Sequence, residues 1–142
     1  MKKCWIRLFV LTGFFAFAGC QNSTTIPSEV TTTTTNLLEY SDFPDLILTS
    51  PDEQLAQVED DYYLYFYGPI CEHCTLIKGE VLAKLSVMEM DKVYLVEADS
   101  LDDIHDEISL TKTPGLVHIV MHEVDSVVIG MASVMEIIRQ LE

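Results

Sequence analysis

Residues 62–74 have the sequence YYLYFYGPICEHC and place two cysteines between a predicted strand and a predicted helix. The aromatic run 62–67 contains no breaker, as is typical of a buried central strand. Residues 75–90 follow with apolar side chains at helical spacing, so Cys71 and Cys74 lie where this helix begins. Two thiols at this separation can close a disulfide without moving the backbone, and unpaired N–H groups at a helix start stabilise a thiolate. The stretch therefore predicts reversible thiol–disulfide exchange.

The rest of the chain predicts strands alternating with helices. Further strands are expected at 46–49, 93–96, 116–121 and 126–129, and further helices at 50–58, 102–110 and 134–141. The first of these helices begins with a capping-box pattern, because Ser50 is followed by Pro51 and Glu53. This order predicts an α/β protein with a single mixed β-sheet of four to five strands, flanked by helices.

The first 19 residues are predicted to be a signal peptide. Three basic residues lie within the first seven positions, and the uncharged apolar run at 8–18 is short for a membrane span. Residues 17–20, Phe-Ala-Gly-Cys, resemble the processing site of a bacterial lipoprotein, in which the cysteine is lipidated and becomes the mature N-terminus. The resemblance implies a lipid anchor at Cys20, on the extracytoplasmic face of a bacterial cell membrane. The alternatives are an ordinary signal peptide and an uncleaved signal anchor.

A Thr- and Ser-rich tether is predicted at 20–36, ahead of one small domain at 37–142. Nothing in the tether can build a core, so it is expected to be extended and disordered. Cys4 would leave with the signal peptide and Cys20 would carry lipid, so the mature domain would keep only the thiols of the CEHC motif. An exported chain with a single close pair has no wider disulfide framework, which favours a functional pair.

The charge of the chain limits its partners. The 142 residues include 23 acidic and 8 basic ones, and loss of the signal peptide removes three of the basic ones, giving a net charge of about −18. Such a charge excludes nucleic acid as a natural partner and should make anionic lipid headgroups repel the domain. A solvated acidic surface is favoured over a site for a specific cationic substrate.

The combination of these motifs resembles the thioredoxin family. The resemblance covers residues 46–141 and rests on the aromatic strand ending in CxxC and on Thr113-Pro114, which opens a strand 40 residues after Cys74. It implies a thioredoxin fold in which Cys71 is the attacking thiolate and Cys74 the resolving thiol. It also implies a cis Pro114, which would place the backbone of Thr113 against the disulfide to hold an extended substrate strand.

Residues near the motif distinguish this chain from thioredoxin itself. His73 resembles the residue before the second cysteine in protein disulfide isomerase and the periplasmic oxidases, and its imidazole is expected to stabilise the Cys71 thiolate, making the disulfide a stronger oxidant. Ile70 replaces the usual Trp, Tyr65 a buried Asp, and Leu95 the Lys that partners this Asp. Since the Asp–Lys pair assists proton transfer at the buried cysteine, its loss favours an oxidase or isomerase over a reductase.

The sequence thus predicts a thiol–disulfide oxidoreductase, tethered to a membrane and without metal or cofactor, that acts on exported proteins carrying thiols or disulfides. A membrane or extracytoplasmic redox partner would restore the redox state of its cysteine pair after each exchange. The alternative is a non-catalytic accessory lipoprotein that binds a partner protein, which the acidic stretch 99–107 and the missing Trp and Asp favour. Zinc binding by the cysteine pair and histidines is least favoured, because His118 and His122 in one strand would lie about 13 Å apart and His105 is expected to face solvent.

Overall fold

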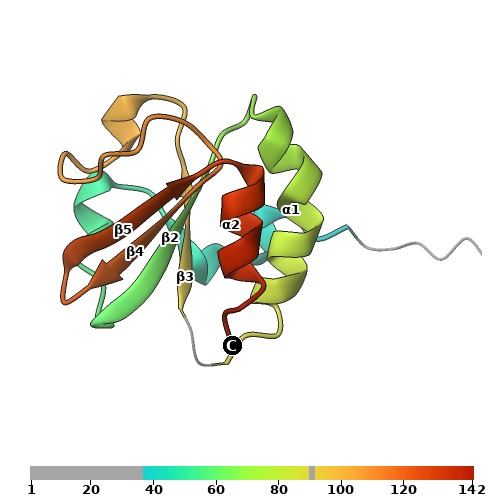
Figure 1. Ribbon diagram of the computed structural model, residues 1–142, viewed down its shortest axis with the longest axis horizontal. Helices are drawn as coiled ribbons and strands as arrows, with labels where there is room; N and C mark the ends of the chain where they lie inside the picture. Colours follow the sequence, from blue (N-terminus) through green and yellow to red (C-terminus); the bar gives the residue numbers. More distant parts are fainter. Residues whose placement is uncertain (1–36, 90–91) are drawn as a thin grey trace, which may run out of the picture. The chain divides into compact units, whose positions relative to one another are not determined.

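The computed structural model describes residues 37–89 and 92–142 (Figure 1). The chain divides into two units, Met1–Thr34 and Thr35–Glu142, and the described residues all belong to the second. The predicted signal peptide at 1–19, the lipidation site Cys20 and the tether at 20–36 lie outside the described residues. Within the described part, no helix combines the length and the apolar character that crossing a bilayer requires.

Five strands form one mixed sheet in the order β1-β3-β2-β4-β5. They are β1 (Ile47–Leu48), β2 (Asp61–Tyr67), β3 (Val93–Glu97), β4 (Gly115–Val120) and β5 (Glu123–Ile129). β3 pairs in parallel with both β1 and β2, while β4 pairs antiparallel with both β2 and β5. The predicted mixed sheet is confirmed, with the aromatic strand β2 at its centre.

Two α-helices, α1 (Glu72–Leu85) and α2 (Met131–Ile138), pack against the same face of the sheet (Figure 1). Their buried residues include Val81, Leu82, Val134 and Ile138, in one core with strand residues Tyr65, Tyr67, Leu95 and Leu116. The two helices are also joined at the surface, where Arg139 donates to both carboxylate oxygens of Glu80, at 2.6 and 3.1 Å.

The helix predictions are right in kind and shifted at their ends. α1 runs through Gly79 without interruption and ends at Leu85, and Leu76, which was expected on its apolar side, is 67% exposed. α2 begins three residues before the expected start at 134, because Gly130, with a φ of 97°, turns the chain into the helix. Glycine adopts this left-handed conformation without a steric penalty.

Among the described residues, no α-helix covers the opposite face of the sheet. Successive side chains of β2 point to opposite faces, so Leu64 and Phe66 lie in a second core, away from α1 and α2. Ile108 and Leu110, from the connection between β3 and β4, pack onto this second core. That connection therefore acts as one of the two layers around the sheet.

The helix predicted at 50–58 is wrong beyond its first turn. The capping box is present, but the chain forms only a single 3-10 turn, Pro51–Glu53, and Val58 is 95% exposed. The buried side chain of Gln54 explains the early end. It donates to the backbone oxygen of Asp103 and accepts from the backbone N–H of His105, which ties the segment to the β3–β4 connection.

The acidic helix predicted at 102–110 is also wrong. Only the 3-10 turn Leu101–Asp103 forms, and the Asp103 carboxylate accepts hydrogen bonds from the backbone N–H groups of Asp99 and Ser100. Aspartate side chains that bond nearby backbone in this way compete with helix formation. The following residues instead turn inward and bury Ile108 and Leu110.

Candidate active site

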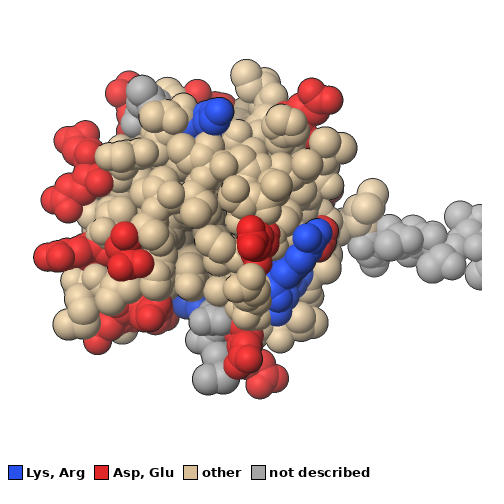
Figure 2. Space-filling model, in the orientation of Figure 1, with Lys and Arg blue, Asp and Glu red and all other residues tan. Residues whose placement is uncertain are grey.

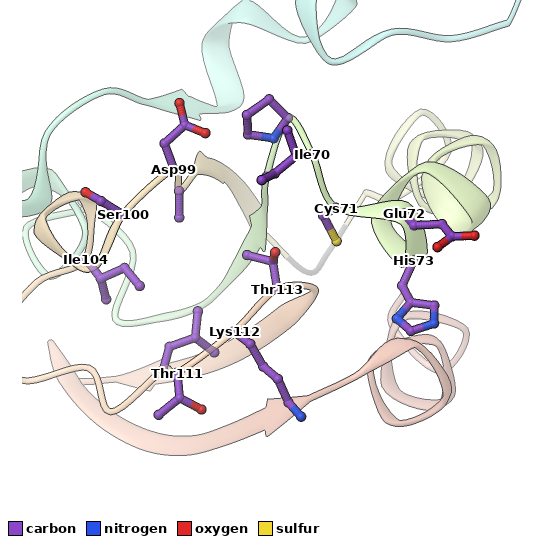
Figure 3. Close-up of a pocket in the computed structure, with 14 residues that line it drawn as sticks. Ile70, Cys71, Glu72, His73, Asp99, Ser100, Ile104, Thr111, Lys112 and Thr113 are labelled. Atoms are coloured by element: carbon purple, nitrogen blue, oxygen red, sulfur yellow. The ribbon is translucent and has the colours of Figure 1, made fainter.

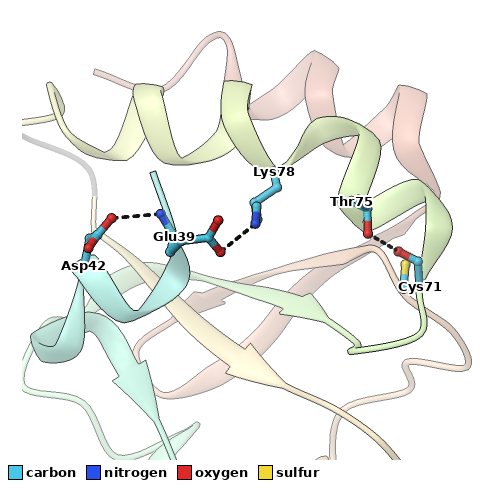
Figure 4. A network of polar contacts seen from close by, with 5 residues as sticks. All are labelled: Glu39, Asp42, Cys71, Thr75 and Lys78. Atoms are coloured by element: carbon cyan, nitrogen blue, oxygen red, sulfur yellow. Dashed lines mark hydrogen bonds and ion pairs between the residues drawn. The ribbon is translucent and has the colours of Figure 1, made fainter. Parts of the chain in front are cut away.

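The two cysteines of the motif lie at the N-terminus of α1 and form a disulfide bond. Cys71 is the N-cap residue, so its sulfur accepts a hydrogen bond from the backbone N–H of Cys74, at 3.1 Å. Its carbonyl oxygen accepts from the Thr75 hydroxyl at 3.2 Å (Figure 4). Cys74 is only 2% exposed, whereas Cys71 is partly exposed. A reagent in solvent therefore meets the Cys71 sulfur first, as expected for the attacking residue.

Thr113-Pro114 lies next to this disulfide, and the peptide bond between the two residues is cis, as the resemblance implied. The carbonyl of Pro114 accepts a hydrogen bond from the N–H of Gly130 at 2.8 Å, which fixes the start of β4 against the turn into α2. Gly115 then pairs with Phe66 on β2. The two halves of the predicted site thus meet because β2 and β4 are antiparallel neighbours: one ends where the other begins.

Gly68 allows the close approach of these two halves. A Cβ atom at this position would lie 3.2 Å from the Ala98 oxygen, 3.3 Å from Thr113 Oγ1 and 3.7 Å from Cys71 Cβ. The first two distances are tighter than ordinary van der Waals contacts, so any side chain here would push the walls apart. The glycine directly after β2 thus allows Ala98, at the end of β3, and Thr113 to lie close to the disulfide.

An open groove of about 490 Å³ runs beside the Cys71 sulfur (Figure 3). One wall carries Ile70, Cys71 and His73, and the facing wall comes from the β3–β4 connection, with Thr113 toward the sulfur. Ile70 is 97% exposed. The other residues that line the groove are Gly68, Pro69, Glu72, Ala98, Asp99, Ser100, Ile104, Leu110, Thr111 and Lys112. The groove thus offers apolar side chains beside the partly exposed Cys71.

The sequence did not single out Lys112, Ile104 or Leu110, which come from the irregular connection rather than from a strand or helix. Only the expected pairing of the strands could have indicated that this connection lies near the cysteines. Ala98 follows β3, and because β2 and β3 are parallel, their carboxyl ends meet at the edge where the cysteines lie. Lys112 is the one lysine or arginine among the described groove residues, which also include the acidic residues Glu72 and Asp99.

Phenol and leucine side chains occupy the positions of the missing Asp–Lys pair. Tyr65 and Leu95 pair across β2 and β3, and both are completely buried. Burial raises the pKa of Tyr65 to about 12 and also raises the pKa of Tyr40. The two hydroxyls lie close enough to perturb each other's pKa, although no hydrogen bond of standard geometry joins either of them to a described residue. This layer therefore holds no carboxylate that could exchange a proton with Cys74.

The histidines outside the motif lie away from the cysteine pair. His118 on β4 sits between the carboxylates of Asp61 and Asp125, at 2.8 and 3.0 Å, and stacks on Tyr63 near the start of β2. His122 lies in the β4–β5 turn with a φ of 64°, so its expected place in the strand is wrong. Among the described residues, no three metal-binding side chains form a group that could hold an ion.

Comparisons with known proteins identify the fold. No protein-family model matches the chain, and neither does any curated protein sequence. Among solved structures, it is similar to oxidised thioredoxin O2 from Arabidopsis thaliana, with 20% identity and a TM-score of 0.53 over 68% of this chain and 92% of that one. The thioredoxin of Fasciola hepatica matches with 16% identity and a TM-score of 0.55, over 68% and 98%.

Thioredoxin f2 from Chlamydomonas reinhardtii gives a similar result, with 22% identity and a TM-score of 0.52 over 67% of this chain and 94% of that one. These neighbours are matched almost from end to end by the described domain. The chain therefore has the thioredoxin fold, with a cysteine pair at CxxC spacing on it. At these identities the likeness is one of fold.

Proposed function

We propose that this protein is a thiol–disulfide oxidoreductase that exchanges disulfides with exported proteins through Cys71 and Cys74. One observation carries the proposal: the disulfide at the start of α1 and Thr113, whose bond to Pro114 is cis, lie close together and line one open groove. An extended peptide lying in this groove would pass within reach of the Cys71 sulfur. Its backbone could form hydrogen bonds with the backbone of Thr113, which lies just before the start of β4 at Gly115.

The exchange would proceed through a mixed disulfide. In the oxidising direction, a substrate thiolate attacks the Cys71 sulfur, the bond between Cys71 and Cys74 breaks, and the Cys74 thiolate leaves and takes up a proton. A second substrate thiolate then attacks the substrate sulfur of the mixed disulfide and releases Cys71 as a thiolate. The substrate is oxidised by two electrons and the protein pair is reduced; in the reducing direction the same steps run backward.

The residues around the pair favour oxidation or isomerisation. The N–H of Cys74 and the start of α1 favour negative charge on the Cys71 sulfur, and the exposed His73 lines the same groove as Cys71. A stabilised thiolate favours the reduced form and makes the disulfide the stronger oxidant.

The location proposed for this activity is the outer face of a bacterial cell membrane. The signal-peptide pattern at 1–19, the lipoprotein-like Cys20 and the tether pattern at 20–36 support it. Acidic side chains spread over the rim of the face seen in Figure 2, with few basic ones among them. Such a surface supports a domain held off the membrane by its tether, because anionic headgroups would repel it.

The decisive experiment is a redox titration of the full-length chain against glutathione, with Cys4→Ser and Cys20→Ser removing the other thiols. We expect a reversible two-electron couple with a potential above that of thioredoxin, about −270 mV, and toward that of the strongest oxidants, about −120 mV. The Cys71→Ser variant should abolish both the couple and the oxidative refolding of a reduced, disulfide-containing substrate protein. A value at or below that of thioredoxin would reject the oxidising direction.

The accessory-protein alternative makes the opposite prediction. A domain that only binds a partner would leave reduced substrate proteins unchanged and would bind equally well with Cys71→Ser.

The proposed lipid anchor is tested separately, because Cys20→Ala should release the processed protein from membranes if Cys20 is lipidated. Unchanged membrane partitioning with normal processing would reject the anchor.

A further inference from the structure

Two pairs of residues face the helices across β2 and β3, next to each other in register. Tyr65 pairs with Leu95, and Tyr67 pairs with Glu97, one step nearer the carboxyl ends of the strands. Residues two apart on a strand point to the same face, so both pairs lie on the α1 side. The Tyr67 hydroxyl donates a long hydrogen bond of 3.5 Å to Glu97 Oε2. A carboxylate with a hydrogen-bonding partner is therefore absent at Tyr65 and Leu95 but present at the next pair of positions, Tyr67 and Glu97.

This second pair opens onto the buried cysteine. A hollow of about 230 Å³, separate from the substrate groove, is lined by Cys74, Tyr40, Tyr67, Lys78 and Glu97. Gly68, Pro69 and Thr75 complete its lining. A water molecule occupies about 30 Å³ in the liquid, so this volume leaves room for water between Cys74 and Glu97. Cys74 therefore lines this hollow and not the substrate groove, although only 2% of its surface is exposed.

Among the described residues that line the hollow, Glu97 is the only proton acceptor suited to a thiol. Burial, followed by the charge of Glu97, raises the pKa of Tyr67, and burial also raises the pKa of Tyr40, so both phenols stay neutral. Lys78 forms an ion pair with Glu39, whose carboxylate lies 2.6 Å from the Lys78 Nζ (Figure 4). A neutral phenol and an ammonium group donate protons to hydrogen bonds, whereas the carboxylate accepts them.

We infer that Glu97 exchanges the proton of Cys74 through water in this hollow, and that Tyr67 positions its carboxylate. The inference rests on the proposed function and assigns a further residue to it. When Cys74 resolves a mixed disulfide, its S–H proton passes by way of water to Glu97, and the Cys74 sulfur attacks that of Cys71. The bond between Cys71 and the substrate sulfur breaks, the substrate leaves as a thiolate, and the Cys71–Cys74 bond forms. In the reverse direction, Glu97 returns the proton to the Cys74 thiolate.

The test separates the two steps by stopped-flow kinetics. The reduced full-length chain, with Cys4→Ser and Cys20→Ser, is mixed with 5,5′-dithiobis(2-nitrobenzoic acid), whose released thiolate is coloured. Attack by Cys71 releases one equivalent at a rate that depends on reagent concentration. Resolution by Cys74 releases the second equivalent at a rate that does not. Cys74→Ser should show the first phase alone, which assigns the second phase.

Glu97→Gln should slow the second phase about tenfold or more near pH 7, where the thiol needs a proton acceptor, and leave the first phase unchanged. The difference should shrink as pH rises and Cys74 ionises unaided. Tyr67→Phe, which keeps the ring stacked on Tyr40 at 3.7 Å, should slow the same phase less. The matched control is Glu136→Gln, a change at an exposed glutamate on α2.

The direction of the rate change in Glu97→Gln distinguishes proton transfer by Glu97 from a purely electrostatic effect of its charge. Removing a negative charge near a forming thiolate would by itself speed its formation, so a faster second phase in Glu97→Gln at all pH values would overturn the inference. A second phase equal to that of Glu136→Gln would overturn it as well. Failure of the parent chain to show two phases would instead reject exchange by the cysteine pair, and so the proposed function itself.

Discussion

The backbone N–H of Cys74 donates a 3.1 Å hydrogen bond to the sulfur of Cys71. The helix that carries the resolving cysteine thus also holds the attacking one in place. Because this donor belongs to the backbone, it persists whatever side chain occupies the two positions between the cysteines. Substitutions there change the potential of the couple without dismantling its geometry.

His73→Pro should therefore make the couple more reducing. Proline is tolerated in the first turn of a helix, where its missing N–H would be unpaired, so the fold should be kept. We expect the potential to fall by about 30 mV or more, a tenfold change in the equilibrium constant with glutathione. The control is His122→Asn, at a left-handed turn position far along the sheet that asparagine tolerates. An unchanged potential in His73→Pro would reject the tuning role.

Gly68→Ala should weaken exchange, and Gly79→Ala should not. The added Cβ at position 68 would press on the Ala98 oxygen and on Thr113 Oγ1, moving the two walls of the groove apart. At position 79 it would meet nothing within 4 Å, and alanine should stabilise α1 by about 0.5–1 kcal/mol. The measurements are the rate of disulfide transfer and the free energy of unfolding in urea. Equal transfer rates in the two variants would show that the walls need not approach so closely.

Tyr65→Phe should stabilise the protein by about 1 kcal/mol, because it removes a buried hydroxyl that finds no hydrogen-bond partner among the described residues. Tyr62→Phe provides the contrast. The hydroxyl of Tyr62 donates to the backbone oxygen of Gln54 at 2.9 Å, so its loss should cost about 1 kcal/mol. Urea unfolding of the oxidised variants measures both. A destabilised Tyr65→Phe would mean that its hydroxyl contributes to the fold.

Alkaline pH should unfold the domain. Burial raises the pKa of five tyrosines above the ordinary value of 10.0: Tyr40, Tyr62, Tyr65, Tyr67 and Tyr94. Because the fold favours their neutral forms, this contribution to stability is complete below pH 10 and is lost as pH rises through the raised values. Absorbance at 295 nm and circular dichroism should therefore change together above pH 10. Ionisation of these tyrosines near pH 10 with an unchanged dichroism spectrum would contradict the prediction.

The sequence predicted those parts of the molecule in which local pattern and tertiary packing agree. The aromatic run 62–67 and the strand after Pro114 carry strong signals, and both are central in the sheet. The cap at Ser50 was read correctly, but the buried Gln54 ended its helix after one turn. In the same way, the Asp103 carboxylate satisfied the backbone locally, where a longer acidic helix had been expected.

Only the cysteine and proline halves of the candidate site could be predicted in this way. The facing wall of the groove comes from an irregular connection, whose path depends on Ile108 and Leu110 reaching the second core. The pairing of Tyr67 with Glu97 depends on the register of two strands about 30 residues apart in the chain, which no local pattern specifies.

The site combines a strand at the centre of the sheet with an irregular connection, and the backbone amides of these two parts should exchange with solvent at different rates. β2 is hydrogen-bonded on both sides, and its last residues lead directly to Cys71, so its amides should exchange with solvent deuterium only when the whole domain opens. The connection that forms the facing wall lacks such a ladder, and although Ile108 and Leu110 anchor it in the second core, the amides of its exposed residues should exchange sooner than those of β2. The sulfur would stay fixed while the wall opposite it adjusts, so one reactive centre could accept protein segments of differing shape.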